Sequence, residues 1–127
     1  MKKSILFFFL VALVLVSCKK ASEKNITEVW ELKRITIAGF EIPISTFGTS
    51  ITMELKDDHT GTYTTADTLS VPIDNWELDK KNQTLSLTMS GTTTTYNIAE
   101  FEAKKLMKLE VSIDTLGTAI QEFEIAN

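Results

Sequence analysis

Residues 84–113 read TLSLTMSGTTTTYNIAEFEAKKLMKLEVSI, and this stretch decides the fold class. Apolar side chains recur at every second position from Leu85 to Met89 and again from Met107 to Ile113. A period of two residues is typical of half-buried β-strands, in which successive side chains point to opposite faces. Short connections, including Ser90-Gly91, separate the runs. The stretch predicts three antiparallel strands, at residues 84–89, 92–100 and 106–113.

The same alternation continues on both sides of this stretch. Threonine, isoleucine, valine and aromatic residues are frequent from residue 29 onward, and they suit a pleated, half-buried surface. The first strand changes parity between Leu32 and Ile35, which predicts a β-bulge near Lys33-Arg34. A long loop is expected over residues 38–49. Five further strands are expected at residues 29–37, 50–56, 61–66, 73–79 and 118–125.

Short connections between successive strands favour antiparallel pairing, so eight strands predict an up-and-down meander. Both prolines, Pro43 and Pro72, fall in expected connections between strands. An open meander would expose two strand edges, whereas closing the sheet into a barrel removes both. The favoured fold is therefore an all-β, eight-stranded antiparallel up-and-down barrel, and a two-sheet β-sandwich is the alternative.

The first part of the chain has the three regions of a secretory signal. Lys2 and Lys3 give a positive start, and an unbroken apolar run follows from Ile5 to Val16. The run is shorter than the ~20 residues that a membrane-spanning helix needs. It ends in Leu15-Val16-Ser17-Cys18, which resembles the lipobox of bacterial lipoproteins. We expect residues 1–17 to be a signal peptide cleaved between Ser17 and Cys18; an ordinary secretory signal or an uncleaved anchor helix is the alternative.

Cys18 is the single cysteine of the chain, so it has no partner for an intramolecular disulfide. Two or three acyl chains such as palmitate, at ~0.8 kcal/mol per buried methylene, would anchor the protein durably. An aspartate directly after the lipidated cysteine would resemble an inner-membrane retention signal, but Lys19 stands there. We therefore expect the protein at the outer membrane, on either its periplasmic or its surface face. Residues 18–27 are then the lipidated cysteine and a tether, and residues 28–127 are the barrel domain.

The charge balance excludes one class of partner. The chain has 13 Lys and Arg against 17 Asp and Glu, so removal of Lys2 and Lys3 with the signal leaves 11 basic residues and a net charge of −6. Such acidity argues against nucleic acid as a partner and against broad adsorption to anionic lipid. Lys19, Lys20 and Lys24 form a small cluster of basic residues beside the expected anchor. The length after the signal suits one domain, which we expect to be a monomer.

Six short motifs follow one another along the predicted strands: WEL at 30–32, DDHTGTY at 57–63, NWEL at 75–78, LSL at 85–87, TYNI at 95–98 and LMKL at 106–109. Their order after a lipobox is similar to that of the small lipocalin-like domain found in many bacterial lipoproteins, over about residues 28–126. The resemblance implies a lipid-anchored β-barrel that binds a ligand, without naming the ligand. Lipocalins carry Gly-x-Trp on the first strand, whereas here Glu28 stands at the glycine position and only Trp30 matches. The arginine that packs on that tryptophan in many lipocalins has no clear counterpart.

The inward positions bear on ligand binding, because an eight-stranded barrel either is filled by its own side chains or holds one small ligand. Their bulk favours a largely filled interior, although methionines also line adaptable pockets. The candidate pocket residues are Trp30, Met53, Tyr63, Trp76, Met89, Tyr96, Met107 and Phe123. The candidate lid residues are Phe40, Ile42, Ile44 and Phe47, which alternatively plug the barrel end or contact a protein. We expect a small apolar ligand at one mouth; a filled barrel that binds or inhibits an envelope protein is the alternative.

The sequence offers little for catalysis. His59, the single histidine, follows Asp57 and Asp58, but adjacent turn residues make a poor metal site, so a solvated turn is expected. With Cys18 lipidated, no Cys/His pair remains, and no Ser/His/Asp spacing or phosphate-binding loop is recognisable. We therefore expect a non-enzymatic protein without metal or cofactor.

Two tripeptides indicate a possible modification. Asp67-Thr68-Leu69 and Asp114-Thr115-Leu116 resemble the Asp-Thr-aliphatic acceptor used for O-glycosylation of exported proteins in one group of Gram-negative bacteria. Both fall in predicted loops, where an enzyme would reach Thr68 and Thr115. The alternative is that Asp-Thr is simply a favourable turn pair.

Overall fold

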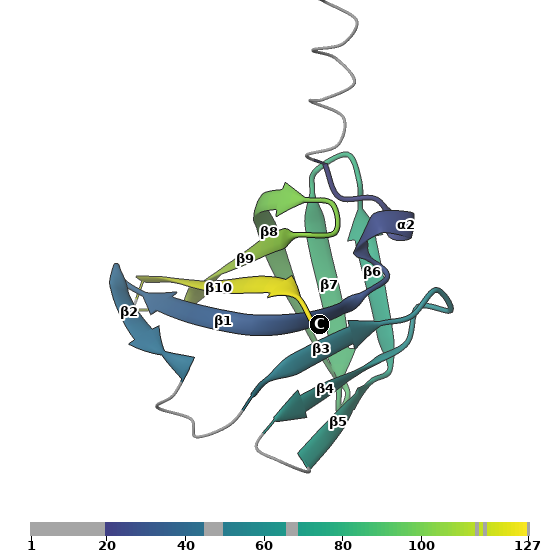
Figure 1. The fold of residues 1–127 in the computed structure, drawn as a ribbon, viewed down its shortest axis with the longest axis horizontal. Helices are drawn as coiled ribbons and strands as arrows, with labels where there is room; N and C mark the ends of the chain where they lie inside the picture. Colours follow the sequence, from purple (N-terminus) through teal and green to yellow (C-terminus); the bar gives the residue numbers. More distant parts are fainter. Residues whose placement is uncertain (1–19, 45–49, 66–68, 114, 116, 127) are drawn as a thin grey trace, which may run out of the picture.

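The computed structural model describes residues 20–44, 50–65, 69–113, 115 and 117–126. Within these ranges the chain forms one antiparallel, nearly closed, barrel-shaped sheet with a short helix at one end (Figure 1). The expected all-β antiparallel barrel is confirmed, although its sheet has ten described strands where eight were expected. Several sites predicted from the sequence lie outside the described residues: the signal segment with Ser17 and Cys18, the lid residue Phe47, and Thr68.

The described strands are β1 (Val29–Ile37), β2 (Phe40–Pro43), β3 (Thr52–Leu55), β4 (Gly61–Thr65), β5 (Leu69–Ile73), β6 (Asn75–Asp79), β7 (Thr84–Met89), β8 (Thr92–Glu102), β9 (Leu106–Ile113) and β10 (Gly117–Ile125), and helix α2 spans Glu23–Ile26. Their order in the sheet is β5-β4-β3-β1-β10-β9-β8-β7-β6, and β2 pairs with β1. Because β10 pairs with β1, the first and last strands of the meander meet, and the sheet order ends at β5 and β6.

The barrel has a seam between β5 and β6, the two strands that end the sheet order, and one bent segment of chain forms both sides of it. The last strands of the sheet order, β5 and β6, are separated in the sequence only by Asp74, whose backbone N–H donates to the Thr88 carbonyl at 2.8 Å. β5 pairs with β4, and β6 pairs with β7. The prediction of a connection at Pro72 is wrong, because β5 includes this proline. An edge strand tolerates a residue without a backbone N–H, since one side of the strand has no ladder partner.

The register of β1 contains the predicted irregularity. Its pairing with β10 shifts between Leu32 and Arg34, which confirms the β-bulge. A second shift, between Ile98 and Glu100 in β8, was not predicted.

The loop expected over residues 38–49 contains a strand. β2 pairs with the second half of β1, and the hairpin turns through Ala38 and Gly39, whose φ angles are 52° and 86°. Two consecutive positive φ values are typical of tight two-residue hairpins, and Asn-Gly or Asp-Gly is their usual sequence signal. Ala38 lacks that signal, so the sequence reading missed this hairpin and placed Pro43 in a loop.

Residues 21–26 pack as part of the barrel domain, although the sequence assigned them to the tether. Ala21 and Ile26 are fully buried in the core. The Ala21 backbone N–H donates to Gln83 Oε1 at 2.9 Å, and Gln83 Nε2 donates to the Ala21 carbonyl at 3.2 Å. A capping box between Ser22 and Asn25 begins α2. The barrel domain therefore includes residues within three positions of Cys18, the expected lipidation site.

Candidate functional site

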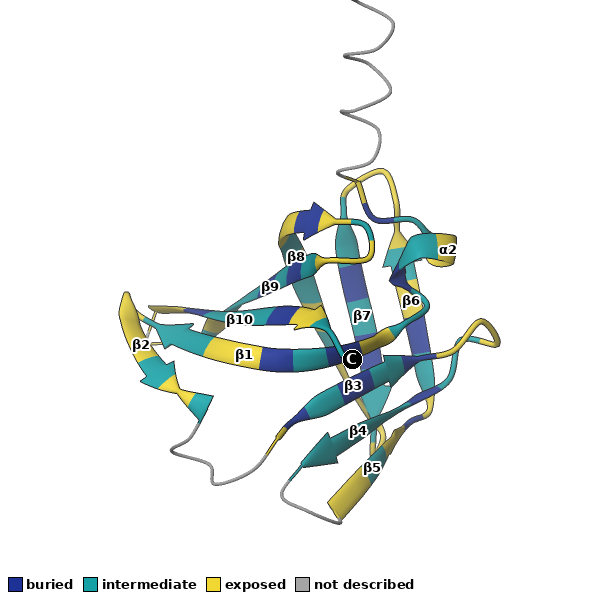
Figure 2. Cartoon of the chain, viewed as in Figure 1, coloured by how far each residue is buried: buried dark blue, intermediate teal, exposed yellow. Residues whose placement is uncertain are grey.

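The two ends of the barrel differ in how completely they are filled. We call the end that carries α2 the closed end and the opposite end the open end. Strands β1, β4, β7 and β9 all run from the closed end to the open end. Inward side chains near the closed end of these strands are buried: Trp30, Leu32, Leu85, Leu87, Met107 and Leu109. Inward side chains nearer the open end of these four strands are partly exposed: Ile35, Ile37, Tyr63, Met89, Val111 and Ile113. The change is confined to these strands, because on β10 Ala119 is buried near the open end and Ile125 is partly exposed near the closed end. Figure 2 shows this change along β1, from dark blue bands on the α2 side to teal beside β2.

Trp76 fastens the seam at the closed end. Its backbone N–H donates to the His59 carbonyl at 2.8 Å. Its indole Nε1–H donates to the Lys56 and Thr60 carbonyls at 2.9 and 3.1 Å. All three acceptors belong to the turn between β3 and β4, whereas Trp76 lies on β6. These bonds therefore hold the two sides of the seam together around a fully buried side chain.

His59 takes part in this contact: it lies in the predicted turn, and its side chain, 31% exposed, also packs against the protein. The imidazole stacks on the Trp76 ring with a centroid distance of 4.5 Å and an interplanar angle of 4°. Nδ1 lies 2.8 Å from the Trp76 carbonyl, and Nε2 lies 2.9 Å from Glu23 Oε1. Both partners are acceptors, so both ring nitrogens donate only when the ring is protonated. The hydrogen bond to Trp76, followed by that to Glu23, raises the pKa of His59.

Trp30 links α2 to the interior in a similar way. Its Nε1–H donates to the Ile26 carbonyl at 3.0 Å, and its ring centroid lies 6.0 Å from that of Phe101. A hydrogen-bonded indole fills space without leaving a buried donor unpaired. The closed end is consequently sealed by aromatic side chains whose polar atoms have partners.

Three polar residues on the inward side, Tyr63, Tyr96 and Gln121, have no such partners among the described residues. Tyr63 and Tyr96 pack partly buried against the core. Burial, together with the neighbouring Tyr96, raises the pKa of Tyr63 to about 12, and burial raises the pKa of Tyr96. Both phenols therefore stay neutral near neutral pH. Gln121 alternates with Ala119 and Phe123 on β10, both of which are buried, so it shares their inward face. Among the described residues, no hydrogen bond engages either phenol or the Gln121 amide.

The candidate pocket residues divide between these two regions. Five of them are fully buried and fill the core: Trp30, Met53, Trp76, Met107 and Phe123. The other three are partly exposed: Tyr63, Met89 and Tyr96. Gln121 was not predicted from the sequence, because a polar residue in a strand is usually expected to face solvent. The parity of β10, counted back from Phe123, is the signal that places it inside.

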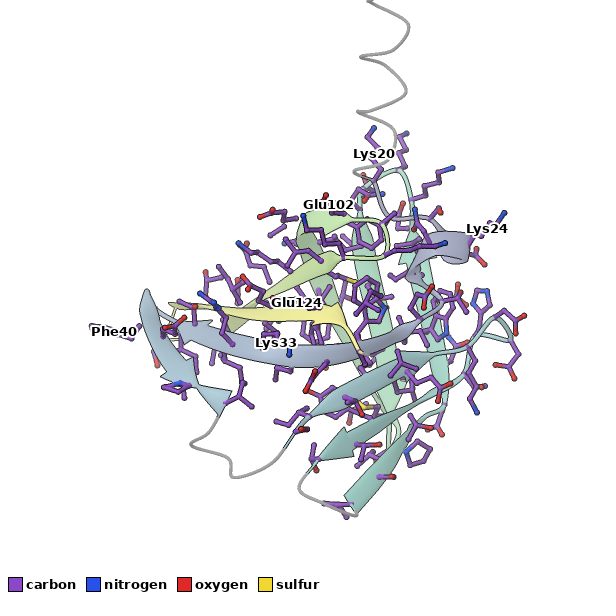
Figure 3. The ribbon with its side chains drawn as sticks, viewed as in Figure 1. Lys20, Lys24, Lys33, Phe40, Glu102 and Glu124 are labelled. Atoms are coloured by element: carbon purple, nitrogen blue, oxygen red, sulfur yellow. The ribbon has the colours of Figure 1, made fainter. Side chains whose placement is uncertain are left out.

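Three of the candidate lid residues, Phe40, Ile42 and Ile44, are described, and they lie at the open end. Register pairs Phe40 with Ile37 and Ile42 with Ile35, and directly paired side chains share one face of the sheet. Phe40 is 76% exposed, and Figure 3 shows it projecting at the edge of the molecule on β2. Ile42 is partly exposed, and Ile44 packs against the core. The hairpin thus extends an apolar face beyond the barrel wall.

Two shallow clefts lie at the closed end, beside α2. Their volumes are about 420 and 410 Å³, and charged side chains including Glu23, Lys24, Asp57 and Asp58 line them. Within the part of the chain that the structure describes, no three His, Cys, Asp or Glu side chains are grouped to hold a metal ion. No helix in the same ranges is long and apolar enough to cross a membrane.

No family model, curated protein or solved structure matches the chain. The likeness to lipocalin-like lipoproteins stays a prediction from the sequence motifs. Of the two candidate glycosylation sites, Thr115 is exposed.

Proposed function

We propose that this protein is a lipid-anchored binding protein that holds one small ligand in the open end of its barrel. The observation that carries the proposal is the change from buried to partly exposed inward side chains between the closed and open ends. A barrel filled throughout would bury the inward residues at both ends. Here solvent reaches apolar side chains such as Met89 and Val111, which is the arrangement that a ligand-binding mouth requires.

The lining indicates the chemical class of the ligand. Ile35, Met89 and Val111 offer apolar contact, and the thioether of Met89 adapts to different shapes. The phenols of Tyr63 and Tyr96 and the amide of Gln121 offer hydrogen bonds. Charged residues are absent from the buried set among the described residues. The lining therefore fits a small, mostly apolar and uncharged molecule with one polar group, bound without a cofactor or catalytic step.

Anchoring through Cys18 is the second part of the proposal, and the lipobox-like segment supports it. Metabolic labelling with an alkynyl palmitate should label the wild-type chain and leave Cys18→Ser unlabelled. The anchor is contradicted if the mature protein begins elsewhere than at residue 18. The intact mass of the native protein also tests glycosylation, because a mass equal to the lipidated polypeptide alone rules out sugars on Thr68 and Thr115.

Native mass spectrometry tests ligand binding directly. Among the described residues, the core cluster runs from Ala21 to Ile125, so residues 20–127 serve as the test protein. After exposure to a lipid extract of bacterial envelopes, we expect a reproducible added mass. Met89→Trp should abolish it by filling the mouth. Asn97→Trp is the matched control, since Asn97 is exposed on the outer face beside Tyr96.

A bare polypeptide mass under gentle conditions would contradict the ligand-binding proposal. The alternative is then an interaction protein that contacts an envelope partner through the β1–β2 hairpin. The exposure of Phe40 and its alignment with Ile37 favour that alternative. Loss of a captured partner on Phe40→Ser, with the barrel intact, would support it.

A further inference from the structure

The chain enters the domain at the closed end. The paired hydrogen bonds between Ala21 and Gln83 fix residue 21 on the turn between β6 and β7. Cys18 precedes Ala21 by three residues, which span roughly 10 Å when fully extended. A lipid on Cys18 would therefore hold this end of the barrel against the membrane surface.

The same end gathers lysines from three segments that are distant in the sequence. Lys20 and Lys24 come from the entry of the chain and α2, Lys80 and Lys81 from the β6–β7 turn, and Lys104 and Lys105 from the β8–β9 turn. We call these six the basic surface, and all six are exposed. Figure 1 shows both turns beside the point where the described chain begins, and Figure 3 labels Lys20 and Lys24 there.

The acidic residues on these segments are occupied within the protein. Glu23 bonds to His59, Asp79 bonds to the side chain of Asn82, and Glu102 pairs with Lys105 at 3.7 Å. The other five lysines of the basic surface have no ion pair among the described residues. On these segments the six lysines outnumber the three acidic residues, whereas the chain after the signal is acidic as a whole. Asp57 and Asp58 lie at the same end of the barrel, in the clefts beside α2.

We propose that the basic surface binds the anionic headgroups of the membrane in which the protein is anchored, and that this contact points the open end away from the membrane. The inference rests on the proposed anchor for its location, and on the lysines for its chemistry. Each lysine near an anionic bilayer raises the binding constant about fivefold. The overall acidity of the chain limits adsorption in any other orientation.

Vesicle flotation tests the basic surface without the anchor. Residues 20–127 lack Cys18, so a failure here is distinguishable from a failure of lipidation or of ligand binding. We expect binding to vesicles of phosphatidylglycerol and phosphatidylcholine in equal parts, weakening with salt, and little binding to phosphatidylcholine alone. The variant Lys81→Glu/Lys104→Glu should lose about tenfold or more in affinity.

The matched control is Lys33→Glu/Arg34→Glu, which makes the same change of charge on the barrel wall. Its affinity should stay close to wild type, and circular dichroism melting checks that both variants fold. Equal losses in both variants, equal binding to both kinds of vesicle, or no binding to anionic vesicles would each overturn the proposal.

Orientation has its own readout, because residues 20–127 contain no native cysteine. On anionic vesicles, a dye on Lys81→Cys should be quenched by headgroup-labelled lipid, while a dye on Phe40→Cys should not. Stronger quenching at Phe40→Cys would show that the open end faces the membrane.

Discussion

The two ends of the barrel use the same kinds of side chain to opposite effect. At the closed end, the indole N–H of Trp76 has two carbonyl acceptors, and the ring is fully buried. Toward the open end, the phenol of Tyr63 has no partner among the described residues, and the residue is partly exposed. Buried polar atoms with partners rigidify a core, whereas polar atoms that face solvent without a protein partner remain available to a ligand. The difference separates the structural end from the candidate binding end.

The largest expected loss of stability comes from a substitution at Gly61, at the closed end. A Cβ atom built on this residue would lie 2.1 Å from the Glu54 carbonyl oxygen, which is backbone and cannot swing away. Gly61→Ala should lower the free energy of unfolding by about 3 kcal/mol or more, measured by urea denaturation.

Gly91→Ala is the control for Gly61→Ala. Gly91 has φ of 79° but no atom within 4 Å of the added carbon, so only backbone strain of about 1 kcal/mol is expected. Equal destabilisation by the two variants would mean that packing against β3 does not determine the cost at Gly61.

Trp76→Phe should have the next largest effect. The change leaves the Lys56 and Thr60 carbonyls without their indole donor, and so removes two of the three hydrogen bonds from Trp76 across the seam. We expect a loss of about 2 kcal/mol in the free energy of unfolding, together with faster hydrogen exchange in β6. Unchanged exchange in β6 would contradict the role of Trp76 in closing the barrel.

His59 should make the stability of the closed end depend on pH. The pKa of His59 is raised in the folded protein, so its contribution is fully present below the ordinary value of about 6.5 and is lost as pH rises through the folded pKa. His59→Gln should therefore destabilise the protein more at about pH 5.5 than at about pH 8.5. A destabilisation that is the same at both pH values would show that the stacking on Trp76, rather than the charge, is what matters.

Tyr96→Phe and Gln121→Leu should have the smallest effects on stability. Neither side chain makes a hydrogen bond within the described part of the protein, so the free energy of unfolding should change by less than about 0.5 kcal/mol for Tyr96→Phe. Ligand affinity should nevertheless fall in both variants, as native mass spectrometry would show. A stability loss as large as that of Trp76→Phe would mean that Tyr96 is part of the sealed core.

Much of the fold was predictable, because strand alternation is a local property. The bounds of β1, β7 and β9 agree with the sequence reading, and the β-bulge was visible in the parity change after Leu32. Two strands were missed for local reasons as well. β2 follows a turn through Ala38 that has no sequence signal, and β5 contains a proline that an edge strand tolerates.

The candidate site was less predictable, because it depends on how the ends of the strands are arranged in space. Parity correctly placed Met53, Met89 and Met107 inside, but it does not say which end of the barrel each one occupies. The contact of His59 with Trp76 joins residues 17 positions apart across the seam, and no local pattern indicates it. Ala21 bonds to Gln83, 62 positions away, and no local pattern predicts such a contact. Residues from Ala21 onward were therefore assigned to the tether.

Methionine oxidation tests the central claim most directly, because Met53, Met89 and Met107 report on the two regions in one experiment. Met53 and Met107 are fully buried, whereas Met89 is partly exposed toward the open end. Under dilute hydrogen peroxide, with the products located by peptide mass spectrometry, Met89 should oxidise first while Met53 and Met107 stay reduced. Oxidation of all three at one rate, or of Met107 before Met89, would contradict a barrel that is closed at one end and open at the other.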